Sequence, residues 1–378
     1  MTRIYLVRHA EAEGNYYRRL QGHYDSRVTV RGRAQLLALE KRFSGISLDA
    51  VYTSDLSRTR LTARAMTHGG AVPLVEDSRF REIDLGPWEN VPFGWVELYQ
   101  KDDLDRFSHQ IEHWHIDGAE PYDSFTGRFL TALEEAARRH PNGTIAVATH
   151  GGVLRASLRR LFPGMEGGHA DNTSVTALDY LNGSFDLIYA NDASHLDESI
   201  STLAHQHWWR DPSQRALDEN LWFRPVTTEE GQRYVEFRED AWKLIYGSLR
   251  DFNGPGFLSD AWQNADGEPQ ALAFAMRGPQ IAGLIQLNMH RGQEQGAGYI
   301  PFIYLRPEFR GRGLGVQLLG HAVSVFRPLG RTSIQLSVAP NNRNAIRFYE
   351  KNGFTLLQKA RGNKRYALHL MGLDIRLD

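Results

Sequence analysis

Apolar and polar residues alternate along the first half of the chain with two different periods. Short apolar runs such as Ile4–Val7 and Thr144–Thr149 are typical of buried strands, and longer stretches place residues such as Phe125, Phe129 and Leu133 on one helical face. We expect strands over 4–7, 50–53, 72–75 and 144–149, helices over 31–43, 56–68, 124–139 and 151–161, and a hairpin of strands 175–180 and 185–190. This alternation predicts an α/β sandwich with a mostly parallel sheet.

The second half starts a new series of elements. We expect a strand over 221–226, two helices within 228–250, strands over 271–277, 280–288 and 299–305, a helix over 313–326, a strand over 333–338, a helix over 344–351, and strands over 354–359 and 366–373. Residues 191–220 are polar and break the pattern, and Trp208 and Trp209 suggest that this segment docks onto something. Because 378 residues exceed one ordinary core, we predict domains over 1–190 and 221–378 joined by a linker over 191–220.

Composition narrows the classes of function. The chain has 44 basic and 45 acidic residues, so no global field favours nucleic acid or an anionic membrane. It has no cysteine, which excludes disulfides, thiolate metal ligands and cysteine nucleophiles. No apolar run approaches the ~18 residues of a membrane span, and the N-terminal residues do not resemble a secretion signal. We therefore expect a cytoplasmic protein that acts on small molecules.

Charged and imidazole side chains follow several predicted strands of the first half. Arg8 and His9 come directly after the first strand, Arg58 begins the helix after the second, and His150 follows the strand over 144–149. Glu82 lies in the segment FREIDLGPWE. Ligands of open α/β sheets bind at the carboxyl ends of the strands, so this set is a candidate anion site.

These residue types can transfer a phosphoryl group. Two guanidinium groups can clamp a phosphomonoester dianion, and a neutral His9 can attack phosphorus while its other ring nitrogen donates to a backbone carbonyl. His150 can bind the oxygens that gain charge in the transition state. Glu82 can protonate the leaving group and then activate water.

The segments LVRHAEAEGN, SDLSRTRLTA, FREIDLGPWE, ATHGG and DNTSVTALDY occur in that order within about residues 1–190. They resemble the motifs of the histidine phosphatase superfamily, also called phosphoglycerate mutase-like. The resemblance implies a three-layer α/β/α sandwich that needs no cofactor, with His9 as nucleophile, Glu82 as proton donor, and Arg8, Arg58 and His150 around the phosphate. It also implies weaker phosphate contacts from Asn15 and from the backbone of Asn172 or Thr173.

The composition of the segment between Glu82 and His150 favours one of two possible reactions, hydrolysis or a mutase reaction. It is fairly short, rich in aromatic residues, and between Trp88 and Tyr122 its basic residues other than histidine are Lys101 and Arg106. A site for a bisphosphate would need more positive charge than this segment provides. We therefore favour hydrolysis of a monophosphate, and the aromatic residues favour a partly apolar leaving group. A phosphoglycerate mutase-type reaction is the alternative.

A glycine-rich turn marks the second half. Residues 310–315, Arg310-Gly311-Arg312-Gly313-Leu314-Gly315, join a strand to a helix and can aim backbone N–H groups at a pyrophosphate. The segment SVAPNNRNAIRFYEKNGF follows. Together the two motifs resemble the GNAT acyltransferase superfamily over about residues 221–375, which implies an α+β domain with a mixed, mostly antiparallel sheet.

The same resemblance implies that acetyl-CoA is the cofactor of this half and an amine is the acceptor. Arg310, Gly311, Arg312, Gly313 and Gly315 would hold the pyrophosphate, the strand with Ile303 and Leu305 would bind the cofactor through its backbone, Asn342 would contact it, and Tyr349 would protonate the departing thiolate. Two hypotheses remain: a bifunctional enzyme, or a phosphatase whose second half only senses CoA. The sequence identifies neither substrate and indicates no oligomeric state.

Three histidines, His109, His113 and His115, lie close to Glu112 with spacings that metal ligands can have. Only His109 and His113 have the i, i+4 spacing of a helical pair, and no cysteine supports them. We therefore expect no metal site here, and interpret these histidines as surface or substrate-contact residues.

Overall fold

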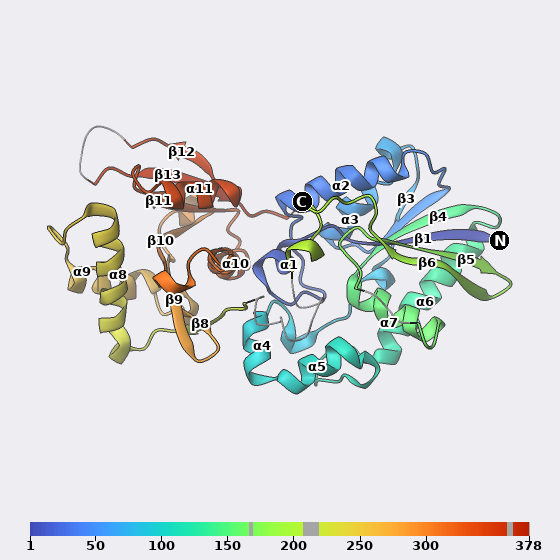
Figure 1. Ribbon diagram of the computed structural model, residues 1–378, viewed down its shortest axis with the longest axis horizontal. Coiled ribbons are helices and arrows are strands. Elements are labelled where there is room, and N and C mark those ends of the chain that lie inside the picture. The colour runs from blue at the N-terminus through green and yellow to red at the C-terminus, as the bar shows by residue number, and fades with distance from the viewer. Residues whose placement is uncertain (166–168, 207–218, 361–365, 378) are drawn as a thin grey trace. The chain divides into compact units, whose positions relative to one another are not determined.

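The computed structural model describes residues 1–165, 169–206, 219–360 and 366–377 (Figure 1). It divides into two compact units, one containing Met1–Val91 and Tyr99–Asp218 and the other containing Pro92–Leu98 and Glu219–Arg376, with the last two residues of the chain grouped with the first unit. Trp208 and Trp209, for which docking was predicted, lie outside the described residues. Within the described residues, none of the helices is long and apolar enough to cross a membrane.

The first unit is built on a six-stranded sheet of order β3-β2-β4-β1-β5-β6. Its strands are β1 (Thr2–Arg8), β2 (Ala50–Thr53), β3 (Leu74–Glu76), β4 (Thr144–Thr149), β5 (Val175–Leu181) and β6 (Ser184–Asp192). The first four in sequence pair in parallel, and β5 and β6 pair antiparallel. This arrangement confirms the predicted mostly parallel sheet.

Helices cover both faces of this sheet. They are α1 (Glu13–Tyr17), α2 (Val30–Phe43), α3 (Ser57–Arg64), α5 (Lys101–His109), α6 (Tyr122–Arg139) and α7 (Gly151–Leu161), and α4 (Phe93–Tyr99) groups mostly with the second unit. Figure 1 shows α2 and α3 on one side of the sheet and α6 and α7 on the other, which confirms the three-layer sandwich. Leu39 and Phe43 of α2 are buried in a cluster with Val51 of β2, because their spacing puts them on one helical face.

The second unit contains a seven-stranded sheet of order β12-β13-β11-β10-β9-β8-β7. The strands are β7 (Trp222–Pro225), β8 (Leu272–Arg277), β9 (Gln280–Asn288), β10 (Ala297–Leu305), β11 (Ser333–Val338), β12 (Thr355–Gln358) and β13 (His369–Asp374). Among the strands of the described residues, β10 and β11 are the one parallel pair of this sheet. The helices are α8 (Gly231–Tyr246), α9 (Gly254–Ala265), α10 (Gly315–Phe326) and α11 (Arg343–Lys351). The mixed, mostly antiparallel sheet confirms the predicted class.

The prediction of two helices within 228–250 is wrong. That stretch holds α8 after a short 3-10 turn, and the second helix, α9, begins at Gly254. Gly247 ends α8 in the left-handed conformation with φ 72°. The Asn253 side chain then caps α9 by accepting from the Gly256 N–H at 3.0 Å. Pro255 lies in the first turn of α9, where the backbone N–H of a residue would have no partner within the helix. A proline, which usually breaks helices, is therefore compatible with the start of this one.

Other boundaries differ by a few residues. The helix predicted over 56–68 ends at Arg64, and the strand predicted over 72–75 is Leu74–Glu76. Helices α4 and α5 between Glu82 and His150 were not predicted at all. Trp88, Phe107 and Trp114 from this segment pack on one another, with ring centroids 5.0–5.9 Å apart. Their aromatic content therefore serves packing and does not by itself indicate an apolar leaving group.

Two helical glycines of the first unit should respond oppositely to an added methyl group. A Cβ on Gly32 of α2 would lie 2.2 Å from the Glu11 carbonyl oxygen, whereas one on Gly127 of α6 would meet nothing within 4 Å. We expect Gly127→Ala to stabilise the first unit by roughly 0.5–1 kcal/mol, because alanine favours helix interiors, and Gly32→Ala to destabilise it by roughly 1–3 kcal/mol. Urea unfolding of both variants tests this, and equal effects would contradict the close approach of α2 to Glu11.

Candidate active sites

His9 lies in the turn that follows β1 and is 3% exposed. Its backbone N–H donates to the Thr149 carbonyl at 2.8 Å, and its Nδ1 lies 2.7 Å from the Ala10 carbonyl oxygen. A carbonyl only accepts, so Nδ1 carries the proton and Nε2 keeps its lone pair. This is the contact that the sequence analysis expected. Burial, followed by the charges of Arg58 and Arg8, holds the pKa of His9 well below its ordinary value.

His150 follows β4 at the start of α7, and its ring centroid lies 5.2 Å from that of His9. The two meet because β1 and β4 are parallel neighbours with Arg8 opposite Thr149. His150 Nε2 lies 2.8 Å from the Ser54 hydroxyl, which is 2.6 Å from the Thr59 hydroxyl. Its Nδ1 is buried and has no partner among the described residues. Burial, then the charge of Arg58, also lowers the pKa of His150 well below its ordinary value.

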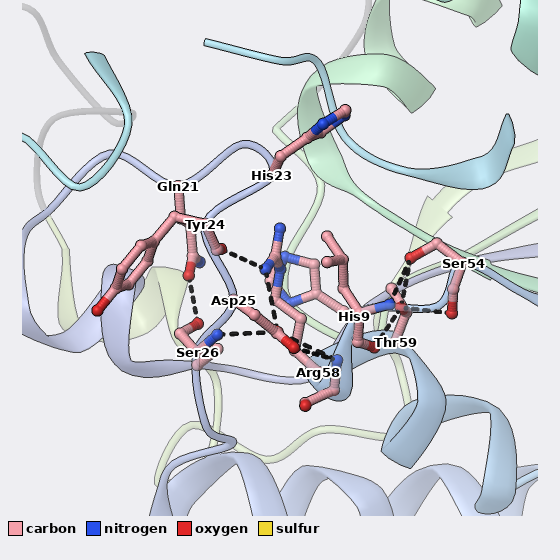
Figure 2. Close-up of polar contacts among 12 residues, drawn as sticks. His9, Gln21, His23, Tyr24, Asp25, Ser26, Ser54, Arg58 and Thr59 are labelled. Atoms are coloured by element: carbon pink, nitrogen blue, oxygen red, sulfur yellow. Dashed lines mark hydrogen bonds and ion pairs between the residues drawn. The ribbon is translucent and has the colours of Figure 1, made fainter. Parts of the chain in front are cut away.

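Arg58 is fully buried and is held by the loop that precedes α2. Its Nη1 donates to the Tyr24 carbonyl at 3.0 Å and its Nη2 to the Gly22 carbonyl at 2.6 Å, while Asp25 lies 3.7 Å away. Figure 2 shows the Arg58 guanidinium beside the His9 ring, with Tyr24 and Asp25 around it. These contacts fix the guanidinium plane and still leave the buried Nε without a partner among the described residues.

Arg8 approaches the same group of side chains from the end of β1. Its Nη1 donates to the Ala170 carbonyl at 2.5 Å, and its buried Nε also lacks a partner within the described residues. A Cβ on Gly151 would lie 3.0 Å from this Nε, so only glycine lets α7 begin so close to Arg8. Arg8, Arg58 and His150 thus each hold one buried nitrogen that an anion could satisfy.

Glu82 lies beneath the N-terminus of α7. Its Oε2 accepts from the Gly152 N–H at 2.8 Å, and its Oε1 accepts from the N–H groups of Val153 at 2.6 Å and Ile83 at 3.0 Å. Its charge acts on both Arg8 and Arg58. Since Oε2 accepts a single bond, it retains a lone pair for a proton.

The two asparagines predicted as substrate contacts have structural partners. Asn15 Oδ1 accepts from the Ala12 N–H at 3.1 Å, inside the first turn of α1. Asn172 Nδ2 donates to the His9 carbonyl at 2.8 Å, and its backbone N–H donates to Asp171. The Thr173 N–H donates to the Arg8 carbonyl at 3.0 Å. Asn172 and Thr173 therefore hold the loop of Arg8 and His9, and their backbone donors are occupied.

The sequence analysis did not predict the residues that hydrogen-bond to the site residues and to the loops that carry them. Ser54 and Asp171 are the first residues of the segments SDLSRTRLTA and DNTSVTALDY, so the sequence held a signal for both although no role was predicted for either. Asp171 accepts from Ser201 Oγ at 2.5 Å and from the Thr202 N–H at 3.1 Å. Thr202 also donates to Glu11 at 3.0 Å. Residues from the predicted linker therefore bind the loops that begin at Arg8 and at Asp171.

The second candidate site surrounds the turn after β10. Gly311 and Gly313 have φ of 73° and 76°, and a Cβ on either would meet nothing within 4 Å. They are therefore required for the backbone conformation and leave space beside it. A Cβ on Gly315 would lie 3.1 Å from the Phe348 ring, so this glycine lets α10 and α11 pack closely.

The two arginines of this turn have partners in the second unit. Arg310 Nε donates to the Leu305 carbonyl at 2.7 Å and its Nη2 lies 3.4 Å from Asp240. Arg312 pairs with Glu219 at 2.5 Å. The Glu219 side chain is 3% exposed, so a phosphate at this turn would compete with a buried carboxylate for Arg312, whereas Arg310 and Asp240 form an exposed and weaker contact.

Ile303 and Leu305 lie where β10 separates from β11. The parallel pairing of these strands runs from Ala297↔Ser333 to Ile300↔Leu336 and then stops, although both strands continue. On its other side β10 stays paired with β9 through Leu305. One backbone edge of residues 301–305 is therefore without a strand partner among the described residues, and an extended ligand could bind there.

Asn342 and Tyr349 mark the two ends of α11. Asn342 is the N-cap of this helix, and its Oδ1 accepts from the Ala345 N–H at 3.2 Å. Tyr349 lies between Phe348 and Phe354, with ring centroids 5.4 and 5.5 Å away. Burial raises the pKa of Tyr349 to about 12, so its phenol keeps its proton at neutral pH.

Comparison with known proteins gives a match for each unit. Residues 4–193 match the Histidine phosphatase superfamily (branch 1), and residues 232–354 match the Acetyltransferase (GNAT) family. Phosphoserine phosphatase 1 of Hydrogenobacter thermophilus is 33% identical over 156 residues, which cover 41% of this chain and 74% of that protein. Probable phosphoglycerate mutase GpmB of Shigella boydii is 28% identical over 218 residues, covering 52% and 96%. The solved structure of Bacillus stearothermophilus YhfR is 31% identical, covers 52% of this chain and 100% of that one, and has a TM-score of 0.50.

The lowered pKa of His9 should make the stability of the folded protein depend on pH. The unfolded chain takes up a proton at His9 near pH 6.5, whereas the folded site resists it. This contribution is therefore complete above pH 6.5 and is lost as pH falls below it, by at most about 1.4 kcal/mol per pH unit. We expect His9→Asn to flatten the decline of the melting temperature between pH 7 and pH 5. The exposed His68 supplies the control: His68→Asn should leave the decline unchanged, and an equal effect of both variants would refute the assignment.

Proposed function

Because the chain belongs to the histidine phosphatase superfamily over residues 4–193, we propose that its first unit hydrolyses phosphomonoesters through a phosphohistidine at His9. One observation carries this proposal. Arg8, Arg58 and His150 each have a buried nitrogen that lacks a partner among the described residues, and they surround an imidazole whose Nδ1 donates to Ala10. A phosphate dianion supplies the acceptors that these donors lack.

The geometry supports a two-step reaction. The lone pair of His9 Nε2 forms a bond to phosphorus while the bond to the leaving oxygen breaks, and Glu82 gives that oxygen a proton. Arg58 and His150 stabilise the charge on the remaining oxygens. Water then attacks phosphorus, Glu82 takes up its proton, and the phosphorus–nitrogen bond breaks to release phosphate and neutral His9.

Removal of His9 should abolish the covalent intermediate. We expect His9→Ala to lose acid-labile phosphate labelling and to lower kcat by about 1,000-fold or more, because the acceptor atom is absent. Rapid quench with a labelled phosphomonoester measures both quantities, and O-phosphoserine and 3-phosphoglycerate belong in the panel because relatives carry those names. The surface variant His68→Asn is the control. Undiminished labelling in His9→Ala would refute the nucleophile, and isomerised phosphoglycerate without free phosphate would favour a mutase.

We propose that the second unit transfers an acetyl group from acetyl-CoA to an amine. Acetyl-CoA would supply an activated thioester. The residues fit this cofactor, because the turn with Gly311 and Gly313 has open space beside it and residues 301–305 have a free strand edge within the described part of the chain. Its acetyl group would pass to the amine nitrogen as the carbon–sulfur bond breaks. Tyr349 would give its proton to the departing thiolate and would regain one from the amine through water.

Tyr349→Phe tests the acid role separately from binding. We expect it to lower kcat by about 100-fold, and we expect acetyl-CoA to raise the melting temperatures of the variant and the native protein equally. Tyr299→Phe is a matched control, because its hydroxyl binds Ser337 on the neighbouring strand. Stabilisation by acetyl-CoA without turnover over a broad amine panel, in the native protein, would instead identify a CoA sensor.

A further inference from the structure

Two side chains whose donors are not all paired within the described residues, Arg238 and Trp242, lie one helical turn apart on α8. Arg238 packs its guanidinium between the rings of Phe302 and Phe257, 4.2 and 4.6 Å from their centroids. The Trp242 ring centroid lies 5.6 Å from that of Phe257. The two side chains therefore meet over the same phenylalanine, on the side of α8 that faces α9 and β10.

The charge of Arg238 has no carboxylate partner in the described part of the chain. Its Nε donates to the Tyr234 hydroxyl at 2.9 Å and its Nη2 lies 3.3 Å from Gln286 Oε1, and no contact of Nη1 is found there. The Trp242 indole N–H is buried and also lacks an acceptor among the described residues. Aromatic rings attract the cation through their faces, but they do not satisfy N–H donors. Arg238 is only half-buried, so an anionic group can approach its guanidinium from solvent.

The surroundings of these donors are aromatic. Trp242 packs against Tyr246 and Phe252, with ring centroids 4.6 and 5.8 Å away. Arg238, Trp242, Tyr246, Phe252 and Phe257 are neither fully buried nor fully exposed, so the rings and the donors form a partly open surface. A ligand that matches it presents an anionic oxygen to the donors and an apolar ring to the aromatic side chains.

This surface touches the strand that the proposed reaction uses. Phe302 follows the point at which β10 leaves β11, where the last parallel pair is Ile300↔Leu336. The free edge of β10 and the ring that covers Arg238 therefore belong to neighbouring residues of one strand. A molecule bound at Arg238 would therefore lie beside the strand edge, residues 301–305, that we propose binds the cofactor.

We propose that Arg238 and Trp242 bind the carboxylate of the acetyl acceptor, and that this acceptor is an aromatic amino acid. Its ring packs on Trp242, Tyr246 and Phe252, and its α-amine is the nucleophile. The inference rests on the proposed acetyl transfer and adds the chemical class of the substrate. It assigns Arg238 a binding role, since the guanidinium touches the substrate and not the reacting atoms.

The test compares acceptors that differ only in the carboxylate. With saturating acetyl-CoA, we expect the full-length protein to acetylate L-phenylalanine or L-tryptophan with a KM about 10- to 100-fold below that of phenethylamine or tryptamine. Arg238→Met should raise the KM of the amino acids to that of the amines and leave kcat nearly unchanged. Equal KM values for acids and decarboxylated amines in the native protein would overturn the proposal, whether or not the variant folds.

Arg233→Met is the matched control, because Arg233 lies on the same helix, is exposed and loses the same charge. It should leave both KM values unchanged, and a similar rise in KM would show a general electrostatic effect and refute the site. Calorimetric titration of L-phenylalanine into the protein with bound CoA separates this proposal from the proposed function. Binding that depends on the carboxylate but gives no turnover would support the site and contradict acetyl transfer. Turnover of amines that is equal with and without a carboxylate would support acetyl transfer and contradict the site.

Discussion

The in-register pairing of β1 with β4 is the constraint on which the first site depends. It sets Arg8 opposite Thr149 and so delivers His9 and His150 to the same edge of the sheet, with ring centroids 5.2 Å apart. The Ala10 carbonyl then selects the tautomer of His9. A shift of one residue between these strands would point one imidazole to the opposite face, since side chains alternate along a strand.

Burial gives this edge its chemical character. His9, Arg58 and His150 are almost completely removed from solvent, which lowers the pKa of each imidazole and makes every unsatisfied donor costly. The charge of Arg8 is offset by Asp171, Glu82 and Glu11, and that of Arg58 by Asp25, Glu82 and Glu89. The doubly charged phosphate that we propose would satisfy the remaining donors, so affinity for the substrate and the cost of burying these donors would have the same origin.

The two units use aromatic residues in different ways. In the first, Trp88 and Trp114 pack against each other and against Phe107 of α5. In the second, Phe302 and Phe257 enclose the guanidinium of Arg238 and leave donors unused. Both clusters contain a tryptophan N–H without an acceptor among the described residues, that of Trp114 in the first and that of Trp242 in the second. The clusters differ in exposure, because Trp88 and Trp114 are buried whereas the residues around Arg238 are partly open to solvent.

The sequence by itself determined the class of both folds and the residues around His9, because strand-to-helix turns of a parallel sheet converge on one edge whatever the details of packing. It also located the turn with Gly311 and Gly313, since left-handed backbone requires glycine. Tertiary structure alone decided that Asn172 holds the loop of His9, that Ser54 holds His150, and that Thr202 reaches Glu11 across 191 positions of sequence. These contacts join side chains with no periodic relation along the chain, so only the folded packing brings them together. The start of α9 at Gly254 was missed for a local reason, because glycine and proline end most helices and only the Asn253 cap reverses their meaning.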